Sequence, residues 1–408
     1  MRVLFTVSDW PTHWYPLVPL AWALQAAGEE VLVVCPPGQA EGIRAAGLTP
    51  APTVAPALDL MAQARLSDLR EVLAGRGVPG RAVLDPLSGE TLVDPAEFDV
   101  AGFRATWRPH LLRTTAAALE AAVETGTTWR PDLVVHERMS LEGPLVAGVL
   151  GVPAVLHSWG PVGTAEADPR LRLAPGDATG AFARHGLAPW RPDRVTDVLD
   201  PCPAPLEPPV HGRRWRVRPV PYDGGGVVPD LPAPRRPRVC VVWGRSMTPL
   251  TGSGTPVLSA VVDAVQAVGG EAVLLGADDV EAPSTAVRLG TAPLAPVLAG
   301  CAAVVHGGGN GSTMTSIACG VPQVALPHQV ETRVLSERVA TTGASTVLSP
   351  EGSELTARCR DALQHVLSDP APTLAATALQ RAGRERPTPA DLVPRLRDLA
   401  RRDAAVAA

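Results

Sequence analysis

Short runs of apolar residues alternate with longer segments of helical periodicity along most of the chain. The first run covers residues 2–7, residues 17–27 carry apolar side chains at helical spacing, and a second run follows at 30–35. Strand, helix and strand in this order predict a βαβ unit, because two parallel strands need a crossover between them. Further apolar runs at 133–135 and 154–156 predict two more strands of the same sheet.

The alternation of strands and helices resumes after a proline-rich segment. Between residues 200 and 237 the chain gathers prolines, arginines and three consecutive glycines, which predicts a linker. Beyond the linker a second parallel sheet is predicted from the apolar runs at 238–244, 272–275, 302–305 and 323–326. The predicted fold class is therefore α/β, with two Rossmann-like domains that face each other across a cleft.

These patterns divide the chain into four parts. We expect a first domain at 1–205, a linker at 206–236, a second domain at 237–385 and a C-terminal helix at 386–408 that packs back on the first domain. Between residues 50 and 105 the periodicity is lost, which predicts a long irregular segment of functional importance. An Ala- and Leu-rich helix is predicted after it, at residues 109–125.

The most distinctive stretch of the sequence is residues 302–327, which read AAVVHGGGNGSTMTSIACGVPQVALP. A buried strand leads into His306 and a glycine-rich loop, and Ser312 and Thr313 can cap the helix that follows. A helix that begins after such a loop presents backbone N–H groups and its positive dipole end to a phosphate. Similar turns occur where nothing binds, but the run of glycines followed by hydroxyl side chains favours a phosphate site.

Two common classes of phosphate site are excluded by the residues themselves. A Walker loop requires a lysine, and the sequence contains none. The dinucleotide fingerprint fails as well, because Ser312 or Met314 falls where its third glycine should stand. The predicted ligand is therefore a nucleotide other than a nicotinamide dinucleotide.

Composition and charge limit the classes of binding partner that we expect. The 408 residues carry a net charge of −5, with a pI near 6.0, which gives no reason to expect nucleic acid or an anionic membrane as a partner. The six cysteines lack zinc-ligand spacing and predict a reducing cytoplasm. The chain begins with a strand pattern rather than a signal peptide, and no apolar run is long enough to predict a membrane span.

Several motifs, in a fixed order, are similar to those of one enzyme family. They are His13 with Pro16, Leu17 and Pro19, DPCPAPL at 200–206, VPYDGGG at 220–226, HGGGNGST through GVPQ at 306–323, SERVATTGA at 336–344, and PTPADLV at 387–393. Over essentially its whole length the chain resembles the GT-B-fold glycosyltransferases that attach nucleotide-activated deoxysugars to actinomycete antibiotics.

The resemblance implies a reaction and its substrates. We expect an inverting, metal-independent transfer of a deoxysugar from a nucleoside diphosphate sugar, with TDP as the expected nucleotide, to a hydrophobic polyketide-type aglycone. The acceptor would bind in the first domain and the donor in the second, without a cofactor or a metal ion. A homodimer remains open as the assembly. Two alternatives also stay open: a sugar-nucleotide epimerase of the same architecture, and a non-catalytic partner that binds nucleotide sugar for another transferase.

The resemblance also implies the residues that contact the donor, including four departures from the usual family motifs. Gly307 stands where relatives carry a second histidine, so His306 or the loop amides are expected at the diphosphate. Thr291 replaces a tryptophan that stacks on the nucleobase, and Glu331 and Thr332 replace an Asp-Gln pair that holds sugar hydroxyls. Arg245 stands inside a motif that is commonly G-T-S and reads Gly244, Arg245 and Ser246 here. The donor contacts expected from the resemblance are Arg245, Ser246, Thr291, His306, Gly308, Gly309, Gly311, Ser312, Glu331 and Thr332.

Sugar transfer also needs a base that removes the acceptor's proton. We favour His13, because a neutral imidazole can accept a proton near neutral pH, with Glu137 as the carboxylate that orients it or acts directly. Asp9 is the second choice for the carboxylate, and His136 is an alternative base. His13 could also be an ordinary loop histidine. The acceptor is expected to contact Trp10, Trp14, Trp159 and His136, although the tryptophans could equally belong to the core.

Overall fold

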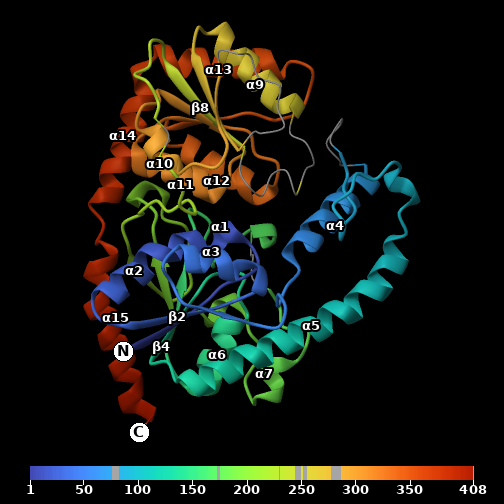
Figure 1. Ribbon diagram of the computed structural model, residues 1–408, viewed down its shortest axis with the longest axis vertical. Coiled ribbons are helices and arrows are strands. Elements are labelled where there is room, and N and C mark those ends of the chain that lie inside the picture. Colours follow the sequence, from blue (N-terminus) through green and yellow to red (C-terminus); the bar gives the residue numbers. More distant parts are fainter. Residues whose placement is uncertain are drawn as a thin grey trace.

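The computed structural model describes residues 1–75, 82–171, 175–228, 230–243, 250, 255–276 and 286–407. Within them, two parallel sheets form two α/β domains, one above the other in Figure 1. The strand orders are β3-β2-β1-β4-β5-β6-β7 and β10-β9-β8-β11-β12-β13. In each sheet the order reverses beside the first strand, β1 or β8, and such a reversal opens a crevice at the carboxyl ends of the strands. The predicted α/β class, with two Rossmann-like domains, is confirmed.

The first domain is built from the amino-terminal half of the chain. Its strands are β1 (Arg2–Thr6), β2 (Glu30–Cys35), β3 (Pro50–Pro52), β4 (Leu133–His136), β5 (Ala154–His157), β6 (Asp197–Asp200) and β7 (Arg213–Arg216). Its α-helices are α1 (Pro11–Trp14), α2 (Val18–Ala26), α3 (Ala40–Ala45), α4 (Leu60–Leu73), α5 (Val100–Trp129), α6 (Glu142–Leu150) and α7 (Ala181–Arg184). Short 3₁₀ turns lie at Tyr15–Leu17, Pro37–Gln39, Pro95–Glu97, Pro169–Leu171, Pro192–Arg194 and Ala204–Leu206.

The second domain holds the remaining strands. They are β8 (Arg238–Val242), β9 (Glu271–Leu275), β10 (Val287–Leu289), β11 (Ala303–His306), β12 (Gln323–Ala325) and β13 (Ser345–Val347). Its helices, followed by the C-terminal pair, are α9 (Thr255–Ala267), α10 (Leu294–Leu298), α11 (Asn310–Cys319), α12 (Val330–Ala340), α13 (Leu355–Ser368), α14 (Pro370–Arg384) and α15 (Pro389–Ala407).

Both sheets are buried on both faces, which explains why their strands are continuous apolar runs. In β1, Val3 and Phe5 join the core cluster on one face of the sheet, while Leu4 packs into another cluster on the opposite face. In β8, Val241 and Cys240 divide in the same way between two clusters. Parallel strands covered by helices on both sides show this pattern rather than an alternation of apolar and polar residues.

The segment expected to be a linker contains a strand of the first sheet. Arg213–Arg216 forms β7, which pairs in parallel with β6 at the edge of the sheet. Its single apolar residue, Trp215, is buried, and the Trp215 Nε1–H donates to Asp197 Oδ1 at 2.6 Å. The strand could not be recognised from the sequence, because it lies at the edge of the sheet and only one of its four residues is buried. The arginines on both sides of Trp215 give it no apolar run. The expectation of a linker throughout 206–236 is therefore wrong at β7.

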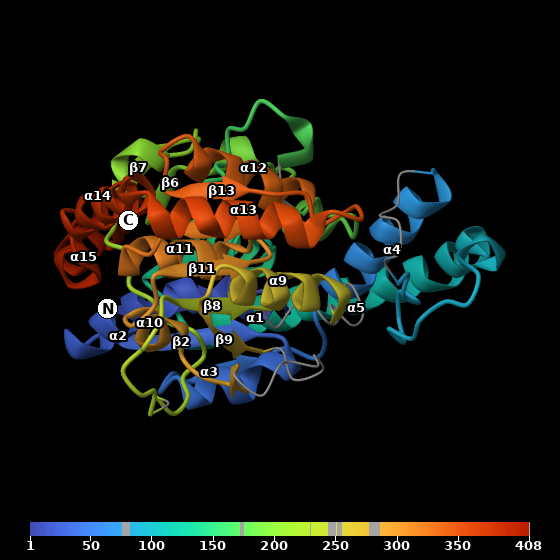
Figure 2. The ribbon, with the colours of Figure 1, turned by 90° about the horizontal axis from the view of Figure 1, so that it is seen from above.

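The stretch from 50 to 105, expected to be irregular, also contains regular structure. It holds β3, α4 and the start of α5, which runs from Val100 through Pro109 to Trp129. Asp59 and Asp99 cap α4 and α5 by accepting the N–H groups of Ala62 and Gly102. Figure 2 shows α4 and the first part of α5 projecting from the body of the molecule. Apart from a small buried cluster around Leu69, most of their side chains are exposed or partly exposed, so the sequence shows little periodicity there.

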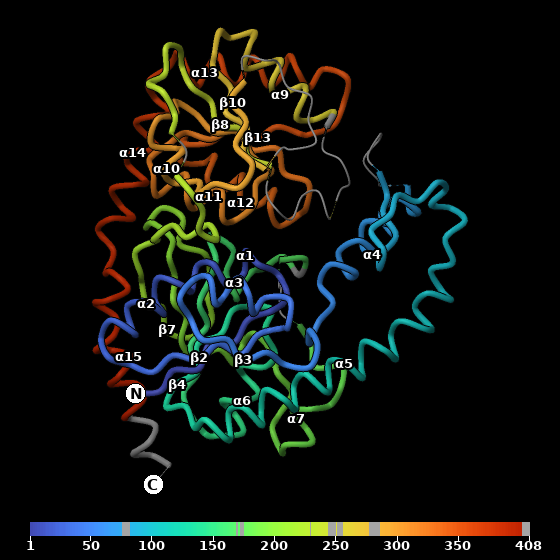
Figure 3. Tube along the Cα trace, in the orientation of Figure 1, coloured from blue at the N-terminus to red at the C-terminus, as the bar shows by residue number. Residues whose placement is uncertain are grey.

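The C-terminal helices lie along both domains. Figure 3 follows α14 and α15 down one side of the molecule, from the second domain to the first. Leu392 and Leu396 of α15 are fully buried in the core cluster that includes Leu20 of α2, and Arg397 donates to Glu29. The chain therefore crosses between the domains twice. Among the described residues, no helix has both the length and the apolar character that a membrane span requires.

Candidate active site

A pocket lies at the carboxyl ends of the central strands of the second sheet. Its walls come from β8, β9, the segment after β10 and the first turn of α11, and Thr12 and Asp223 close it from the first domain and the linker. Thr291, the position expected at the nucleobase, is an exposed residue of this wall. A pocket beyond the carboxyl ends of parallel strands, beside a helix N-terminus, is where an α/β domain binds a nucleotide.

The first turn of α11 supplies backbone donors to this pocket. The helix begins at Asn310, with Gly309 at the N-cap position, and the first backbone bond within the helix runs from the Thr313 N–H to the Gly309 carbonyl at 3.0 Å. The N–H groups of residues 310–312 therefore have no acceptor within the helix. Gly311 and Ser312 line the pocket. Ser312 and Thr313 lie inside the helix, so the expectation that they cap it is wrong.

His306 holds the glycine turn in shape. Its Nδ1 accepts the N–H of Gly308 at 3.0 Å, and its Nε2 donates to Gln323 Oε1 at 2.8 Å. Burial lowers the pKa of His306 to about 4, so the ring is neutral. Gly308 has φ +75°, and a Cβ there would lie 2.8 Å from Ser336 Oγ. Both ring nitrogens of His306 are therefore used within the protein, and the side chain shapes the loop.

The two residues expected at the donor sugar lie at the start of α12. The Thr332 hydroxyl accepts the Gln329 N–H at 3.2 Å and donates to the Gln329 carbonyl at 3.0 Å, so it serves as part of a helix cap. Burial raises the pKa of Glu331, and the positive charge of Arg138 opposes that shift. Within the described part of the chain, the buried Oε1 of Glu331 has no hydrogen-bond partner. Arg245 and Ser246 lie outside the described residues.

On the opposite domain, His13 lies in α1, the short helix that follows β1. Its Nδ1 is 3.0 Å from Ser8 Oγ and 3.8 Å from Glu137 Oε2. Glu137 is fully buried at the end of β4 and accepts the N–H groups of Ser8 at 2.9 Å and Met139 at 2.8 Å. The carboxylate is therefore fixed, and Nδ1 of His13 is turned towards it. Nε2 is the ring nitrogen that can accept a proton from a substrate.

Burial sets the charge state of this pair. It lowers the pKa of His13 to about 3, with a further contribution from the positive charge of Arg138, and it raises the pKa of Glu137 to about 7. His13 is therefore a neutral imidazole at neutral pH and available as a base. Asp9, the second choice for the carboxylate, keeps one buried oxygen without a hydrogen-bond partner in the described part of the chain. The carboxylate next to His13 is that of Glu137.

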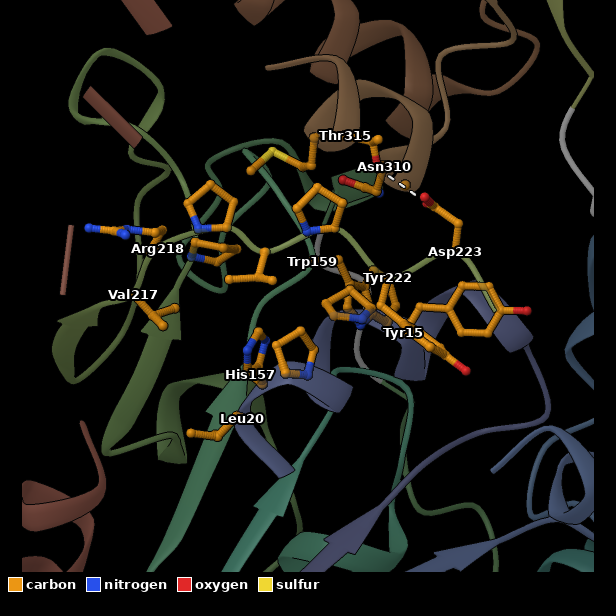
Figure 4. A pocket seen from close by; sticks show the side chains of 18 of the residues that line it. Tyr15, Leu20, His157, Trp159, Val217, Arg218, Tyr222, Asp223, Asn310 and Thr315 are labelled. Carbon is orange, nitrogen blue, oxygen red and sulfur yellow. Dashed lines mark hydrogen bonds between the residues drawn. The ribbon is translucent and has the colours of Figure 1, made fainter. Parts of the chain in front are cut away.

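A second pocket lies between the domains (Figure 4). It adjoins the pocket at the start of α11, which we call the nucleotide pocket after its expected ligand. The second pocket is mainly apolar, and its lining combines Leu20 and His157 of the first domain, Tyr222 of the linker and Asn310 of α11. The dashed line in Figure 4 is the hydrogen bond from Thr315 Oγ1 to Asp223 Oδ1, 3.2 Å long. The residues that line both pockets are Thr12, Tyr15, Asp223 and Gly311. The two pockets thus adjoin in the cleft between the domains.

Comparisons with known proteins agree with this geometry. Residues 22–244 match the model of the erythromycin biosynthesis protein CIII-like N-terminal domain, and residues 259–399 match its C-terminal domain. The chain belongs to this family. The relatives are antibiotic glycosyltransferases, so this chain is a glycosyltransferase, and the epimerase and non-catalytic alternatives are set aside.

Individual relatives cover almost the whole chain. It is 33% identical to the L-demethylnoviosyl transferase of Streptomyces niveus, over 96% of both chains. It is 32% identical to the 10-deoxymethynolide desosaminyltransferase of Streptomyces venezuelae, over 98% of this chain and 97% of that one. The solved structure of spinosyn rhamnosyltransferase SpnG complexed with thymidine diphosphate is 28% identical, with a TM-score of 0.73, over 97% of this chain and 100% of that one.

The aromatic residues expected at the glycosyltransferase's acceptor site divide into two groups. Trp159 stacks on His13 with ring centroids 3.9 Å apart, and Trp10 lies on His13 at 5.7 Å. Trp14 is 3% exposed, belongs to the core cluster, and donates from Nε1 to Gln39. His136 is also buried, with Nδ1 3.1 Å from the Glu137 carbonyl oxygen and its ring against Trp190. Trp14 and His136 therefore occupy core positions.

Three side chains at the site were not predicted from the sequence. Ser8, at the end of the first strand, binds both His13 and Glu137. Arg138 is 5% exposed and lies over Trp159, 5.7 Å from its ring centroid. Gln323 fixes His306. Ser8 and Arg138 directly follow the neighbouring strands β1 and β4, and this was the available signal, because residues at the carboxyl ends of parallel strands come together. Gln323 begins β12, so this signal does not extend to it.

The pair of His13 and Glu137 predicts a pH dependence for the glycosyltransferase. An ionised Glu137 would stabilise the positive imidazolium that forms when His13 takes a proton, and a protonated Glu137 would not. Because burial raises the pKa of Glu137 to about 7, kcat should rise with pH through about 7 and then level off. The measurement is kcat from about pH 5 to about pH 9 for the parent and for Glu137→Gln, which should lose the rise. A parent kcat that is flat over this range would contradict the role of Glu137.

Proposed function

We propose that this glycosyltransferase moves a deoxysugar from a TDP-sugar to a hydrophobic, polyketide-type aglycone, with inversion at the anomeric carbon and without a metal ion. One observation carries the proposal. The base candidate His13 and the pocket residue Thr12 are neighbours in α1, so the proton acceptor and the nucleotide pocket meet across the domain cleft. The names of the relatives and the thymidine diphosphate in the SpnG complex support the choice of donor.

Each step of the transfer has a group suited to it. The acceptor's nucleophile would attack the anomeric carbon while its proton passes to Nε2 of His13, and Glu137 would stabilise the imidazolium. The bond from the anomeric carbon to the diphosphate breaks in the same step, and TDP leaves with the electron pair. The N–H groups of residues 310–312 and the dipole of α11 would stabilise the growing charge on the diphosphate. A single displacement of this kind inverts the anomeric carbon.

The acceptor would lie against the aromatic stack at His13. Trp10 and Trp159 stack on His13, and Trp159 lines the mainly apolar pocket between the domains, which suits a hydrophobic aglycone. The experiment incubates the protein with TDP-deoxysugars and hydroxylated polyketide aglycones and determines the anomeric configuration of the product by NMR. Product of inverted configuration supports the proposal, and product that keeps the donor's configuration contradicts the single displacement.

Chelation should leave the transfer unaffected. The N–H groups of residues 310–312 have no acceptor within the helix, and Gly311 and Ser312 line the pocket that would hold the diphosphate. These groups and the helix dipole can therefore take the place of a cation on the leaving group. We expect kcat in excess EDTA to equal kcat without it, and added Mg²⁺ to change it by less than about twofold. Activity that disappears with EDTA and returns with Mg²⁺ would show that the leaving group needs a metal ion.

A further inference from the structure

Residues 158–171, which follow β5, form a loop between the two domains that we call the bridging loop. On the side of the first domain it is wrapped around the buried guanidinium of Arg138. This group donates to the carbonyl oxygens of Val162 at 2.8 Å, Gly163 at 3.1 Å and Leu171 at 3.2 Å. Three carbonyls converging on one buried cation fix the shape of the loop.

The bridging loop contacts both the candidate base and the helix expected at the diphosphate. At one end, Trp159 stacks on His13 at 3.9 Å between ring centroids. The next residue, Gly160, passes so close to α11 that a Cβ there would lie 2.4 Å from Asn310 Oδ1. Trp159 and Asn310 line the same pocket in Figure 4. Any movement of this loop would therefore change the distance between the base and the helix at the diphosphate.

One arginine of the second domain holds the loop from the other side. Arg338 of α12 donates to both carboxylate oxygens of Glu166 at 2.7 Å and to the Pro161 carbonyl at 2.5 Å. The Glu166 side chain is only 3% exposed and also accepts the Gly163 N–H at 2.7 Å. Next to this pair, Leu335 of α12 packs with apolar residues of the loop, Val162 and Leu171. A bidentate pair of this kind fixes direction as well as distance.

We propose that Arg338 is a positioning residue for the sugar transfer: through Glu166 it clamps the bridging loop to α12, and through Trp159 it fixes His13 relative to the donor. The first turn of the same helix contains Glu331 and Thr332, the residues expected at the donor sugar. Arg338 lines neither of the two pockets described above. It therefore acts on the alignment of the base and not on nucleotide binding. The proposal rests on the transfer reaction proposed above.

The test compares kcat with nucleotide affinity. For Arg338→Ala we expect kcat for transfer to fall by about 10- to 100-fold, because small misalignments of reacting groups have effects of this size. The Kd for TDP should change by less than about twofold, since Arg338 is outside the nucleotide pocket. Arg338→Lys should keep part of the activity, because an ammonium can make one of the two bonds to Glu166. The matched control is Arg333→Ala, an exposed arginine on the same helix, which should keep the parental kcat.

Two further measurements separate the possible results. In Arg338→Ala, amide hydrogen exchange of residues 158–171 should become about tenfold faster, a readout that needs no transfer activity. Combining Arg338→Ala with Glu166→Ala should lower kcat no further than either change alone, because both remove the same clamp. If Arg338→Ala does not fold, the double variant Arg338→Met with Glu166→Gln removes the ion pair without leaving one of its charges unpaired. A parental kcat in this double variant would overturn the positioning role, and a lowered kcat would support it.

The outcomes distinguish this proposal from the proposed function. A parent protein without any transfer activity would overturn the proposed function, whereas faster exchange in the loop would still establish the clamp. A parent that transfers sugar and an Arg338→Ala variant with the same kcat would overturn the positioning role. Equal losses of kcat and of TDP affinity would also overturn it, because they would place Arg338 in nucleotide binding.

Discussion

Replacing His13 with alanine is expected to lower kcat for sugar transfer by about 10²- to 10⁴-fold, the usual effect of losing a general base. Nδ1 of His13 faces Ser8 and Glu137, which leaves Nε2 to accept the acceptor's proton. The nucleotide pocket contains Thr12 but not His13. The Kd for TDP should therefore stay within about twofold of the parental value. The measurement is steady-state kinetics together with calorimetric titration of TDP.

The control for this change is a histidine elsewhere on the same domain. His110 is exposed on the projecting part of α5, and His110→Ala should keep the parental kcat. A His13→Ala variant with parental kcat would contradict the assignment of His13 and would move proton removal to Glu137. A large loss of TDP affinity in this variant would mean that the ring serves donor binding.

Replacing Gly311 with aspartate is expected to weaken TDP binding by about 10²-fold, which corresponds to about 2.7 kcal/mol. Gly311 lines the nucleotide pocket in the first turn of α11, and a Cβ there would meet no atom within 4 Å. The Cβ of the new side chain therefore fits without a clash, and we expect its negative charge to lie beside the diphosphate. Like charges a few ångströms apart in a partly buried site repel by this order of energy, even after solvent screening.

The matched control for charge is Gly311→Asn, which has nearly the same shape without the charge. We expect its TDP affinity to stay within about fivefold of the parent, and thermal unfolding should report both variants as folded. Equal affinities of Gly311→Asp and the parent for TDP would show that the diphosphate does not bind at the start of α11.

Much of the fold could be predicted because buried parallel strands leave a clear pattern in a sequence. The runs at 2–7 and 30–35 correspond to β1 and β2, and the run at 302–305 corresponds to β11. Elements with few buried positions were missed or shortened. In β7 the only apolar residue is Trp215, and the first part of α5 exposes most of its side chains. Their structure depends on neighbouring segments rather than on a periodic pattern.

The site residues, too, could be predicted only where the sequence carries a local pattern. His13 and Glu137 could be predicted to meet because each follows a strand of the same sheet, at its carboxyl edge. The shaping role of His306 could not be predicted, since it depends on a glutamine that begins the next strand. Arg338 and Glu166 lie in different domains, and their pairing depends on how the domains pack. Charged residues are common in any sequence, so nothing in the sequence indicates that Arg338 and Glu166 form a pair.

The most direct test of the account measures TDP release from a TDP-deoxysugar in the presence and absence of a hydroxylated polyketide aglycone. The account predicts that TDP and glycosylated aglycone appear together, in equal amounts, only when both substrates are present. It also predicts that His13→Ala shows neither product at the parental rate. Conversion of the TDP-sugar without an aglycone, or parental TDP release by His13→Ala, would contradict base-assisted transfer between the two domains.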